Sequence, residues 1–198
     1  MRAKPVAPQR AAAAHGRAGG AANRVRIIGG QYRRRLLGFP DGAGLRPTPD
    51  RVRETLFNWL GQDLPGWRCV DLFAGSGALG FEAASRGAAR VAMIERDRAA
   101  LAALEKNRAA LDARQVEIVH ADALAWLAQT REIFDLAFVD PPFDSGLAGP
   151  TLTALAPHLA AGAQVYVEQG SAVAAPPGFI IHRSGRAGRS HFALLTKD

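Results

Sequence analysis

The sequence predicts an α/β fold with a mainly parallel, seven-stranded sheet and helices on both of its faces. From residue 68 onward, short apolar runs alternate with amphipathic segments, which is the pattern of repeated βα units. The length of 198 residues fits one compact domain with short appendages. A composition of 48% hydrophobic and 22% charged residues is that of an ordinary globular protein and excludes wholesale disorder.

The chain begins with two segments of different character. Residues 1–24 contain Ala, Gly, Pro and Arg with almost no large apolar side chain, so we expect a disordered tail without the apolar core of a secretory signal. Residues 25–47 are expected to form a basic β-hairpin around Gly29 and Gly30 and an irregular loop, a segment whose charge suits contact with phosphates.

The remaining residues, 48–198, are expected to form the main α/β domain. Thr48 or Asp50 can cap a first helix that runs to about Leu60. The strands that follow are predicted at residues 69–73, 90–94, 116–119, 134–139, 164–167, 179–182 and 191–196. The helices between them are predicted at residues 78–86, 98–111, 123–129 and 152–159. The last two strands follow each other directly, which predicts an antiparallel hairpin at one edge of the sheet.

The charge of the chain is concentrated at its front. The formal net charge is +7, but residues 1–53 alone carry 12 Lys and Arg against two acids, and the rest of the chain is slightly acidic. A general preference for Arg explains why Arg replaces Lys but not why the two parts differ in sign, so the pattern favours a nucleic-acid partner. No apolar run reaches 18 residues, and the single cysteine, Cys69, indicates a reducing cytoplasm rather than a disulfide framework. Cys69 lies within a predicted strand and is interpreted as a core residue.

Candidate functional residues stand where the predicted parallel strands end, which is where ligands bind in such sheets. After the first of these strands, the glycines of residues 75–80 form a loop that lets a ligand approach the backbone and the start of a helix. Two cofactor classes share this pattern. An acid at Asp71 is unsuited to a pyrophosphate but suits the amino group of a methionine moiety. Glu95 can accept both hydroxyls of a ribose and Asp122 the exocyclic amine of an adenine, although each could also be a helix cap.

A second motif, Asp140-Pro141-Pro142-Phe143, follows the fourth predicted parallel strand. An exocyclic base amine is a poor nucleophile because its lone pair is delocalised into the ring. The Asp140 carboxylate and the Pro141 carbonyl can accept its two protons and turn the lone pair toward a methyl donor. The prolines bring no N–H that would repel the amine, and Phe143 can stack on the base.

These motifs resemble the S-adenosylmethionine-dependent methyltransferases that modify exocyclic base amines. More closely, residues 29–32 (GGQY), 45–48 (LRPT), 51–60 (RVRETLFNWL) and 73–80 (FAGSGALG) resemble the bacterial 16S rRNA guanine-N2 methyltransferases that modify guanine 966. The likeness extends over about residues 24–147. The resemblance implies a Rossmann-like class I methyltransferase fold, S-adenosylmethionine as the cofactor, no metal, and the small ribosomal subunit or its assembly intermediate as the partner.

The resemblance also implies roles for individual residues. The implied cofactor-binding residues are Arg46, Thr48, Asp71, Phe73, Ala74, Gly75, Ser76, Gly77, Glu95, Arg96, Asp122, Ala123 and Asp140. The implied catalytic residues, which hold the target base, are Asp140, Pro141, Pro142 and Phe143. From charge and aromatic content, we expect RNA to be contacted by Arg26, Tyr32, Arg33, Arg34, Arg35 and Arg53.

Other functions remain compatible with parts of the sequence. A DNA adenine-N6 methyltransferase would use the same loop but would need a recognition domain for which the chain has little room. A nicotinamide-dependent oxidoreductase would use the glycine loop and leave Asp140–Phe143 without a purpose. A non-catalytic RNA-binding assembly factor would retain the cofactor pocket. Arg183, Arg186 and Arg189 could extend the RNA surface or simply be solvated. We expect a cytoplasmic monomer.

Overall fold

A computed structural model describes residues 23–41, 47–143 and 145–198 of the chain. Its strands are β1 (Asn23–Arg26), β2 (Leu36–Phe39), β3 (Arg68–Asp71), β4 (Arg90–Glu95), β5 (Val116–His120), β6 (Phe134–Val139), β7 (Leu159–Gln169), β8 (Phe179–Ala187) and β9 (Ser190–Lys197). Its helices are α1 (Asp50–Trp59), α2 (Ala78–Ser85), α3 (Arg98–Leu111), α4 (Ala123–Leu127), α5 (Ala148–Leu155) and the 3₁₀ turn η1 (Ala156–His158). None of the helices in these three stretches is long and apolar enough to cross a membrane.

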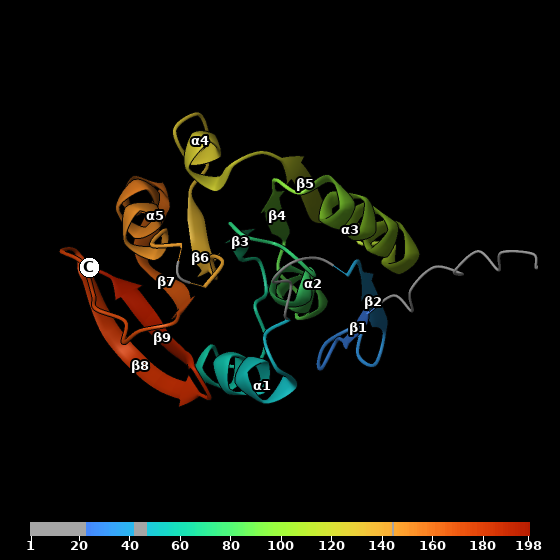
Figure 1. Cartoon of the computed structure of the whole chain (residues 1–198), viewed down its shortest axis with the longest axis horizontal. Coiled ribbons are helices and arrows are strands. Elements are labelled where there is room, and N and C mark those ends of the chain that lie inside the picture. The colour runs from blue at the N-terminus through green and yellow to red at the C-terminus, as the bar shows by residue number, and fades with distance from the viewer. Residues whose placement is uncertain (1–22, 42–46, 144) are drawn as a thin grey trace, which may run out of the picture.

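The main sheet has seven strands in the order β5-β4-β3-β6-β7-β9-β8, and β1 and β2 form a separate antiparallel pair (Figure 1). Strands β5, β4, β3, β6 and β7 are parallel, whereas β9 and β8 extend one edge in antiparallel orientation. The predicted fold class and the terminal antiparallel hairpin are therefore confirmed. The predicted tail lies outside the described residues up to residue 22, and β1 begins at Asn23, ahead of the predicted boundary at residue 25.

Helices cover both faces of the sheet (Figure 1). On one face, the β1–β2 hairpin, α1, α2 and α3 share a core that includes Leu37, Phe57, Phe81 and Leu104. On the other face, α4 and α5 pack through a second core. The alternation of apolar side chains along β3, β4 and β6 supplies both cores, since successive residues of a strand point to opposite faces.

Most element boundaries follow the sequence pattern, and the helix predicted at residues 152–159 is the main error. The helix instead spans Ala148–Leu155, η1 follows, and Leu159 begins β7. Pro150 lies in the first turn of α5, where a proline is tolerated because its missing N–H has no partner there. Pro157 has the opposite effect, since it cannot continue the α-helical ladder.

The start of α1 also differs from the prediction that Thr48 or Asp50 caps the helix. The residue before the helix is Pro49, and no side chain caps this end. The hydroxyl of Thr48 instead donates to the Asp140 carboxylate, with 3.2 Å between Oγ1 and Oδ2. Asp50 is the first helical residue and pairs with Arg26 and Arg53. Both candidate caps are thus engaged by partners that lie far away in the sequence or on the helix itself.

A buried ion cluster joins the hairpin to α1 and α2. The carboxylate of Glu82, on α2, is fully buried and accepts hydrogen bonds from Arg53 Nη1 at 3.3 Å and Arg86 Nε at 2.9 Å. It also accepts the backbone N–H groups of Ile28 at 2.8 Å and Gly29 at 2.7 Å. We call Glu82, Arg53 and Arg86 the Glu82 cluster.

The two glycines of the hairpin make this contact possible. A Cβ on Gly29 would lie 2.4 Å from the Arg86 guanidinium, and a Cβ on Gly30 would lie 1.8 Å from the Ser85 carbonyl oxygen. Gly30 also has φ +70°, a left-handed conformation that glycine adopts without strain. The hairpin therefore packs its backbone directly on α2, and side chains at these two positions would hold it away.

Replacement of Glu82 tests this arrangement. Glu82→Gln removes the charge that faces two buried guanidinium groups, and we expect the free energy of unfolding to fall by about 3–5 kcal/mol, because an uncompensated buried charge is costly. Urea denaturation measures the change. Glu105→Gln is the matched control, since Glu105 forms an exposed pair with Arg108 and such pairs contribute about 0–1 kcal/mol. Equal effects of the two substitutions would show that the Glu82 cluster does not stabilise the fold.

Candidate active site

The site lies at the carboxyl edge of the parallel strands, where four acidic residues stand at or just beyond strand ends. Asp71 ends β3, Glu95 ends β4, Asp140 follows β6, and Glu168 lies near the end of β7. Strand order reverses between β3 and β6, which are direct neighbours, and such a switch point opens a crevice for ligands. The glycine loop after β3 and the Asp140–Phe143 segment therefore meet at this crevice.

The glycine loop turns sharply into α2. Gly75 and Gly77 have φ of +50° and +79°, and Gly77 is the residue that precedes the helix. A Cβ on Gly77 would lie 2.7 Å from Leu104 and Phe81, and one on Gly80 would lie 2.9 Å from Met93. Gly75 and Gly77 thus shape the loop, whereas Gly80 allows α2 to pack closely on β4.

Asp71 is a buried acid with an unused acceptor. Only 1% of the residue is exposed; its Oδ2 accepts the Gly80 N–H at 3.0 Å, and its Oδ1 is buried without a partner among the described residues. The pKa of Asp71 is raised to about 7: burial and the charge of Glu95 raise it, and the Gly80 and Phe73 N–H groups partly offset this by lowering it. A buried acceptor without a donor fits the positively charged amino group of S-adenosylmethionine, which supplies both a proton and a charge.

Glu95 holds the glycine loop in place. Its Oε2 accepts the Gly75 N–H at 2.8 Å and its Oε1 accepts the Asp97 N–H at 2.7 Å. Each carboxylate oxygen has a further lone pair, so the same group can still accept two ribose hydroxyls. The orientation of this carboxylate is fixed by the protein before any ligand arrives.

Asp122 caps α4, which is one of the two roles that the sequence allows for it. Its Oδ1 accepts the N–H groups of Leu124 at 3.0 Å and Ala125 at 3.1 Å. The cap leaves Oδ2 available for the exocyclic amine of an adenine, so the cofactor role of Asp122 and the neighbouring Ala123 stays a prediction. Ala74 and Ser76 are buried in the glycine loop, Phe73 is half-buried, and Arg96 is exposed. Arg46 lies outside the described residues.

Asp140 is held beside the glycine loop by a hydroxyl from the segment before α1. It accepts from Thr48, which is 5% exposed. Burial raises the pKa of Asp140 well above its usual value, the charges of Glu168 and Asp71 raise it further, and the Thr48 hydrogen bond lowers it. Pro141 is buried, whereas the Phe143 ring is 48% exposed and can meet an incoming base.

Glu168 is the site residue that the sequence interpretation missed. It is 4% exposed and is held by two hydroxyls, from Tyr166 to Oε2 at 2.7 Å and from Ser190 to Oε1 at 2.5 Å. The register pairs Val139 with Val167, so Asp140 and Glu168 are the next residues on adjacent strands about 4.8 Å apart. The available signal was an acid near the end of an apolar strand, as at Asp71 and Glu95.

The six predicted RNA-binding residues differ in their exposure and in their contacts within the protein. Arg33, Arg34 and Arg35 are exposed in the hairpin turn, and Arg35 donates to the Ala110 carbonyl at 2.7 Å. Arg53 is wrongly assigned to RNA binding, because its side chain is fully buried in the Glu82 cluster. The sequence predicts a cation available to RNA at this position, whereas the structure shows a buried ion pair between Arg53 and Glu82.

The other two predicted RNA-binding residues are partly engaged within the protein. Arg26 is exposed and pairs with Asp50. Tyr32 is half-buried, packs against the core, and its hydroxyl accepts a hydrogen bond from Gln115.

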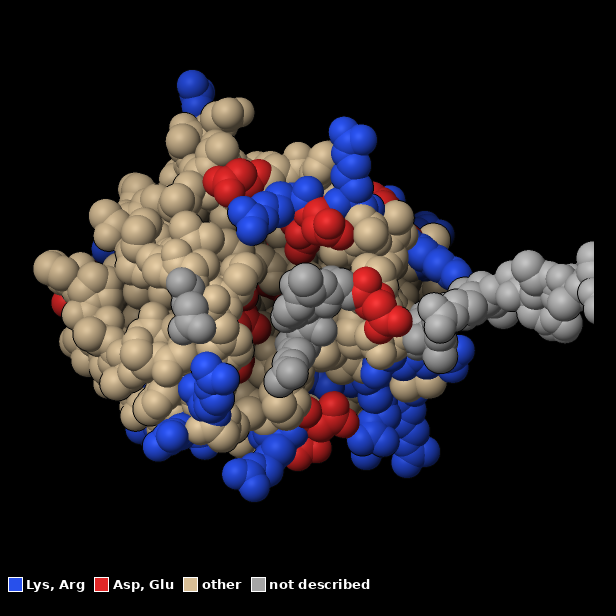
Figure 2. All heavy atoms as spheres, viewed as in Figure 1, with Lys and Arg blue, Asp and Glu red and all other residues tan. Residues whose placement is uncertain are grey.

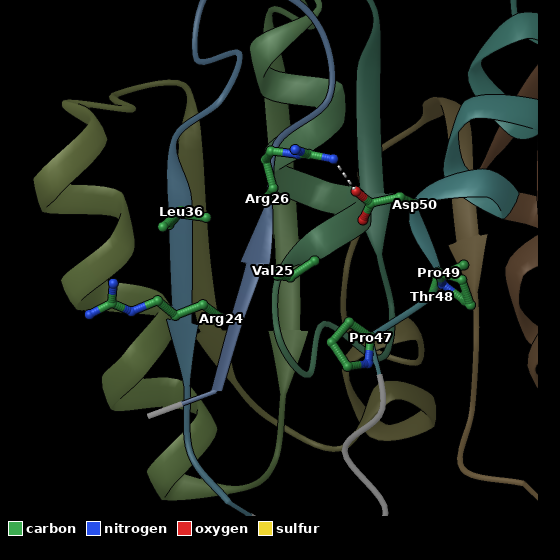
Figure 3. Close-up of a pocket in the computed structure, with 8 residues that line it drawn as sticks. All are labelled: Arg24, Val25, Arg26, Leu36, Pro47, Thr48, Pro49 and Asp50. Carbon is green, nitrogen blue, oxygen red and sulfur yellow. Dashed lines mark hydrogen bonds and ion pairs between the residues drawn. The ribbon is translucent and has the colours of Figure 1, made fainter. Parts of the chain in front are cut away.

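A groove of about 360 Å³ runs between the hairpin and the start of α1 (Figure 3). Arg24 and Arg26 lie along its hairpin side, and Thr48 and Asp50 lie on the opposite side. Thr48 lines this groove and also bonds to Asp140, so the groove and the candidate active site share this residue.

The comparisons with known proteins agree with this geometry. Residues 25–196 match the family model described as "Conserved hypothetical protein 95". The chain is 44% identical over 179 residues to the ribosomal RNA small subunit methyltransferase D of Escherichia coli, with 88% of this chain and 90% of the relative covered. It matches the solved structure of the putative methyltransferase yhhF from Escherichia coli with a TM-score of 0.82 and 45% identity, over 89% of this chain and 99% of the other.

A more distant structure, a Thermus thermophilus 16S rRNA N2 methyltransferase, shares the fold with a TM-score of 0.67 at 23% identity, over 90% of this chain and 50% of the other. The match to the family model spans nearly the whole described chain, and the Escherichia coli methyltransferase is 44% identical over 88% of the chain. The chain therefore belongs to the conserved hypothetical protein 95 family, together with the small-subunit rRNA methyltransferases D that it resembles.

Proposed function

We propose that this protein transfers a methyl group from S-adenosylmethionine to the exocyclic N2 amine of a guanine in 16S rRNA, with guanine 966 as the target. The observation that carries the proposal is the position of Asp140-Pro141-Pro142-Phe143 beside Asp71 and its unused buried acceptor. The 44% identity to a small-subunit rRNA methyltransferase supports the same reaction and the same class of RNA.

Different residues orient the cofactor and hold the target base. S-adenosylmethionine, when bound, supplies a methyl group on a positively charged sulfonium that leaves readily. Asp71 and the glycine loop orient the methionine part, and Glu95 orients the ribose. Asp140 and the Pro141 carbonyl accept hydrogen bonds from the two N–H groups of the guanine amine, so that its lone pair turns toward the methyl group. The Asp140 carboxylate is placed to take the one proton that the nitrogen loses as it is methylated. The Phe143 ring stacks on the base, and positioning of the two reactants lowers the barrier.

RNA binding is assigned to the exposed face of the hairpin. Arg26, Arg33, Arg34 and Arg35 hold phosphates, and Tyr32 contributes part of its ring. We also propose that residues 25–47 act as the RNA-contacting segment and residues 48–198 as the methyltransferase domain. The finer expectations of a metal-free reaction, a monomer and a cytoplasmic location belong to the same proposal.

Asp140→Ala separates catalysis from cofactor binding. We expect methyl transfer to fall by about a hundredfold or more, because the amine loses a charged acceptor placed for the transition state. Binding of S-adenosylhomocysteine, measured by calorimetry, should change little, and Asp71→Asn should weaken it. The assay is transfer of labelled methyl to small-subunit particles from cells lacking the enzyme, followed by nucleoside mass spectrometry. Loss of cofactor binding as the sole defect of Asp140→Ala would contradict the assigned role.

The pH dependence of methyl transfer should follow the ionisation of Asp140, which the charge of Glu168 makes more costly. Protonated Asp140 cannot accept from the amine on its hydroxyl oxygen, so kcat/KM should fall as pH falls through its raised pKa. Glu168→Gln removes a neighbouring negative charge, which makes Asp140 easier to ionise and should shift this limb to lower pH. Glu54→Gln, the same change at an exposed position on α1, is the control. If the acidic limb of the pH profile does not shift in Glu168→Gln, measured with saturating cofactor, then Glu168 does not affect the ionisation of Asp140.

Charge reversal in the hairpin turn tests the RNA surface. Arg33→Glu, Arg34→Glu and Arg35→Glu together should weaken RNA binding and flatten its dependence on salt. The log–log slope should change by roughly 0.7 for each phosphate of single-stranded RNA that the protein no longer neutralises. Filter binding over a salt series measures both quantities. Unchanged affinity would show that this turn is not part of the RNA-binding surface.

A further inference from the structure

The last two strands belong to a second stretch of the described chain, besides the β1–β2 hairpin, that holds cations and no acid. From Gly170 to Lys197 there is no Asp or Glu, whereas the same stretch holds Arg183, Arg186, Arg189 and Lys197. The proposed methyl-transfer chemistry uses none of these four residues. A stretch of 28 residues without an acid is unusual in a region that is otherwise slightly acidic, so these cations are candidates for a separate role.

The sheet register places the β8–β9 turn at the catalytic edge. β9 is antiparallel to β7, and Gln169 near the end of β7 pairs with His191 at the start of β9. β8 is antiparallel to β9, and Ala187 pairs with Ser190 across the turn. The turn therefore lies at the same edge as Asp140, about three strand spacings of 4.8 Å away in the order β6-β7-β9-β8.

The arginines of this turn are exposed and have no acidic partner within ion-pair distance among the described residues. Arg186 donates only to the Gly188 carbonyl within the turn, at 3.0 Å. By contrast, Arg26, Arg68 and Arg90, which are also exposed or half-buried, each pair with a carboxylate. The guanidinium groups of the turn thus remain available to an external anion.

A groove beside the turn adds a contact surface of mixed character. It has a volume of about 360 Å³ and is lined by Val173, Ile181, Arg186 and Phe192, among others. Gly185 forms part of its wall, and a Cβ there would lie 2.6 Å from the Phe192 ring. An apolar floor beside a guanidinium suits the sugar and phosphate of a nucleotide.

The candidate site itself repels a phosphate backbone. Asp71, Glu95, Asp140 and Glu168 gather at the strand ends, and Figure 2 shows acidic atoms inside a hollow in the middle of this face. Lys and Arg side chains border the lower side of the same face, from the β8 side to the β1–β2 hairpin. An RNA strand that delivers one base into an acidic hollow needs cations on each side of it.

We propose that Arg186 and Arg189 of the β8–β9 turn form a second RNA-binding surface, which holds phosphates of the 16S rRNA strand on the side of the target guanine opposite to the β1–β2 hairpin. This inference rests on the proposed function. Together the two surfaces fix the backbone on both flanks while the base enters the site between them. The partner is the RNA backbone, recognised by charge and not by base sequence.

The test is the double variant Arg186→Glu/Arg189→Glu. We expect its affinity for small-subunit rRNA to fall by about tenfold or more. Its salt dependence should flatten by roughly 1.4 in the log–log slope, since the variant neutralises two fewer phosphates. S-adenosylhomocysteine affinity and the unfolding midpoint should stay at the wild-type values. The KM for the particle should rise more than kcat falls, because the acids that hold the amine are untouched.

Arg68→Glu/Arg131→Glu is the matched control. It changes the net charge equally at two exposed arginines, one at the start of β3 and one preceding β6, at the opposite edge of the sheet. Equal weakening in both double variants would overturn the proposal, since it would reflect only the net charge of the protein. Unchanged binding in the turn variant would also overturn it.

Two further outcomes identify the partner of the turn and the step that fails. Weakened binding to the assembled particle, with unchanged binding to naked rRNA, would assign the turn to a ribosomal protein and overturn an RNA contact. If the wild-type protein methylates neither RNA nor particles, the proposed function itself fails. If the wild type is active and the turn variant behaves like the control, only the second RNA surface fails.

Discussion

The buried carboxylate of Glu82 is the interaction on which the position of the site depends. It lies on α2 and accepts hydrogen bonds from an arginine of α1, an arginine at the end of α2 and two backbone N–H groups of the hairpin. Arg53 extends the network through its Nε, which donates to the Thr48 carbonyl at 3.1 Å. The Thr48 hydroxyl then donates to Asp140. A single chain of contacts therefore connects the hairpin, for which we propose an RNA contact, to Asp140, for which we propose a contact with the target amine.

Neighbouring acids at the strand ends raise the pKa of Asp71 and of Asp140. The charges of Glu168 and Asp71 make ionisation of Asp140 more costly, and the charge of Glu95 does the same for Asp71. Such a cluster is stable only if donors or cations reach it. Gly80, Thr48, Tyr166 and Ser190 supply hydrogen bonds from the protein. The acceptors that remain without a donor, such as Asp71 Oδ1, can bind a cation and the two N–H groups of an amine. S-adenosylmethionine carries such a cation, and guanine carries such an amine.

The sequence predicts the parallel sheet well and the long-range pairs poorly, for physical reasons. The spans 98–111 and 134–139 are predicted to the residue, because amphipathic and apolar periodicities are local properties. Arg53 is misassigned because its neighbours in the sequence do not reveal that Glu82 faces it from α2. Glu168 is missed because its importance arises only when β7 lies beside β6. β8 runs to Ala187, beyond the predicted end at residue 182, since its exposed edge position removes the alternation that marks a half-buried strand.

The two ends of the chain are basic and its middle is slightly acidic. This difference follows from the ligands that the site binds. A site that holds a sulfonium, an ammonium group and an amine needs acids, and these acids repel the phosphates of the polymer that carries the amine. Basic residues within the site would neutralise the acids and raise the cost of binding the cofactor. The arginines therefore stand on separate segments, the β1–β2 hairpin before the catalytic strands and the β8–β9 turn after them. The register of β7, β9 and β8 brings the later segment back to the catalytic edge, so basic residues that lie far along the sequence from the hairpin stand at the same edge of the sheet as the site.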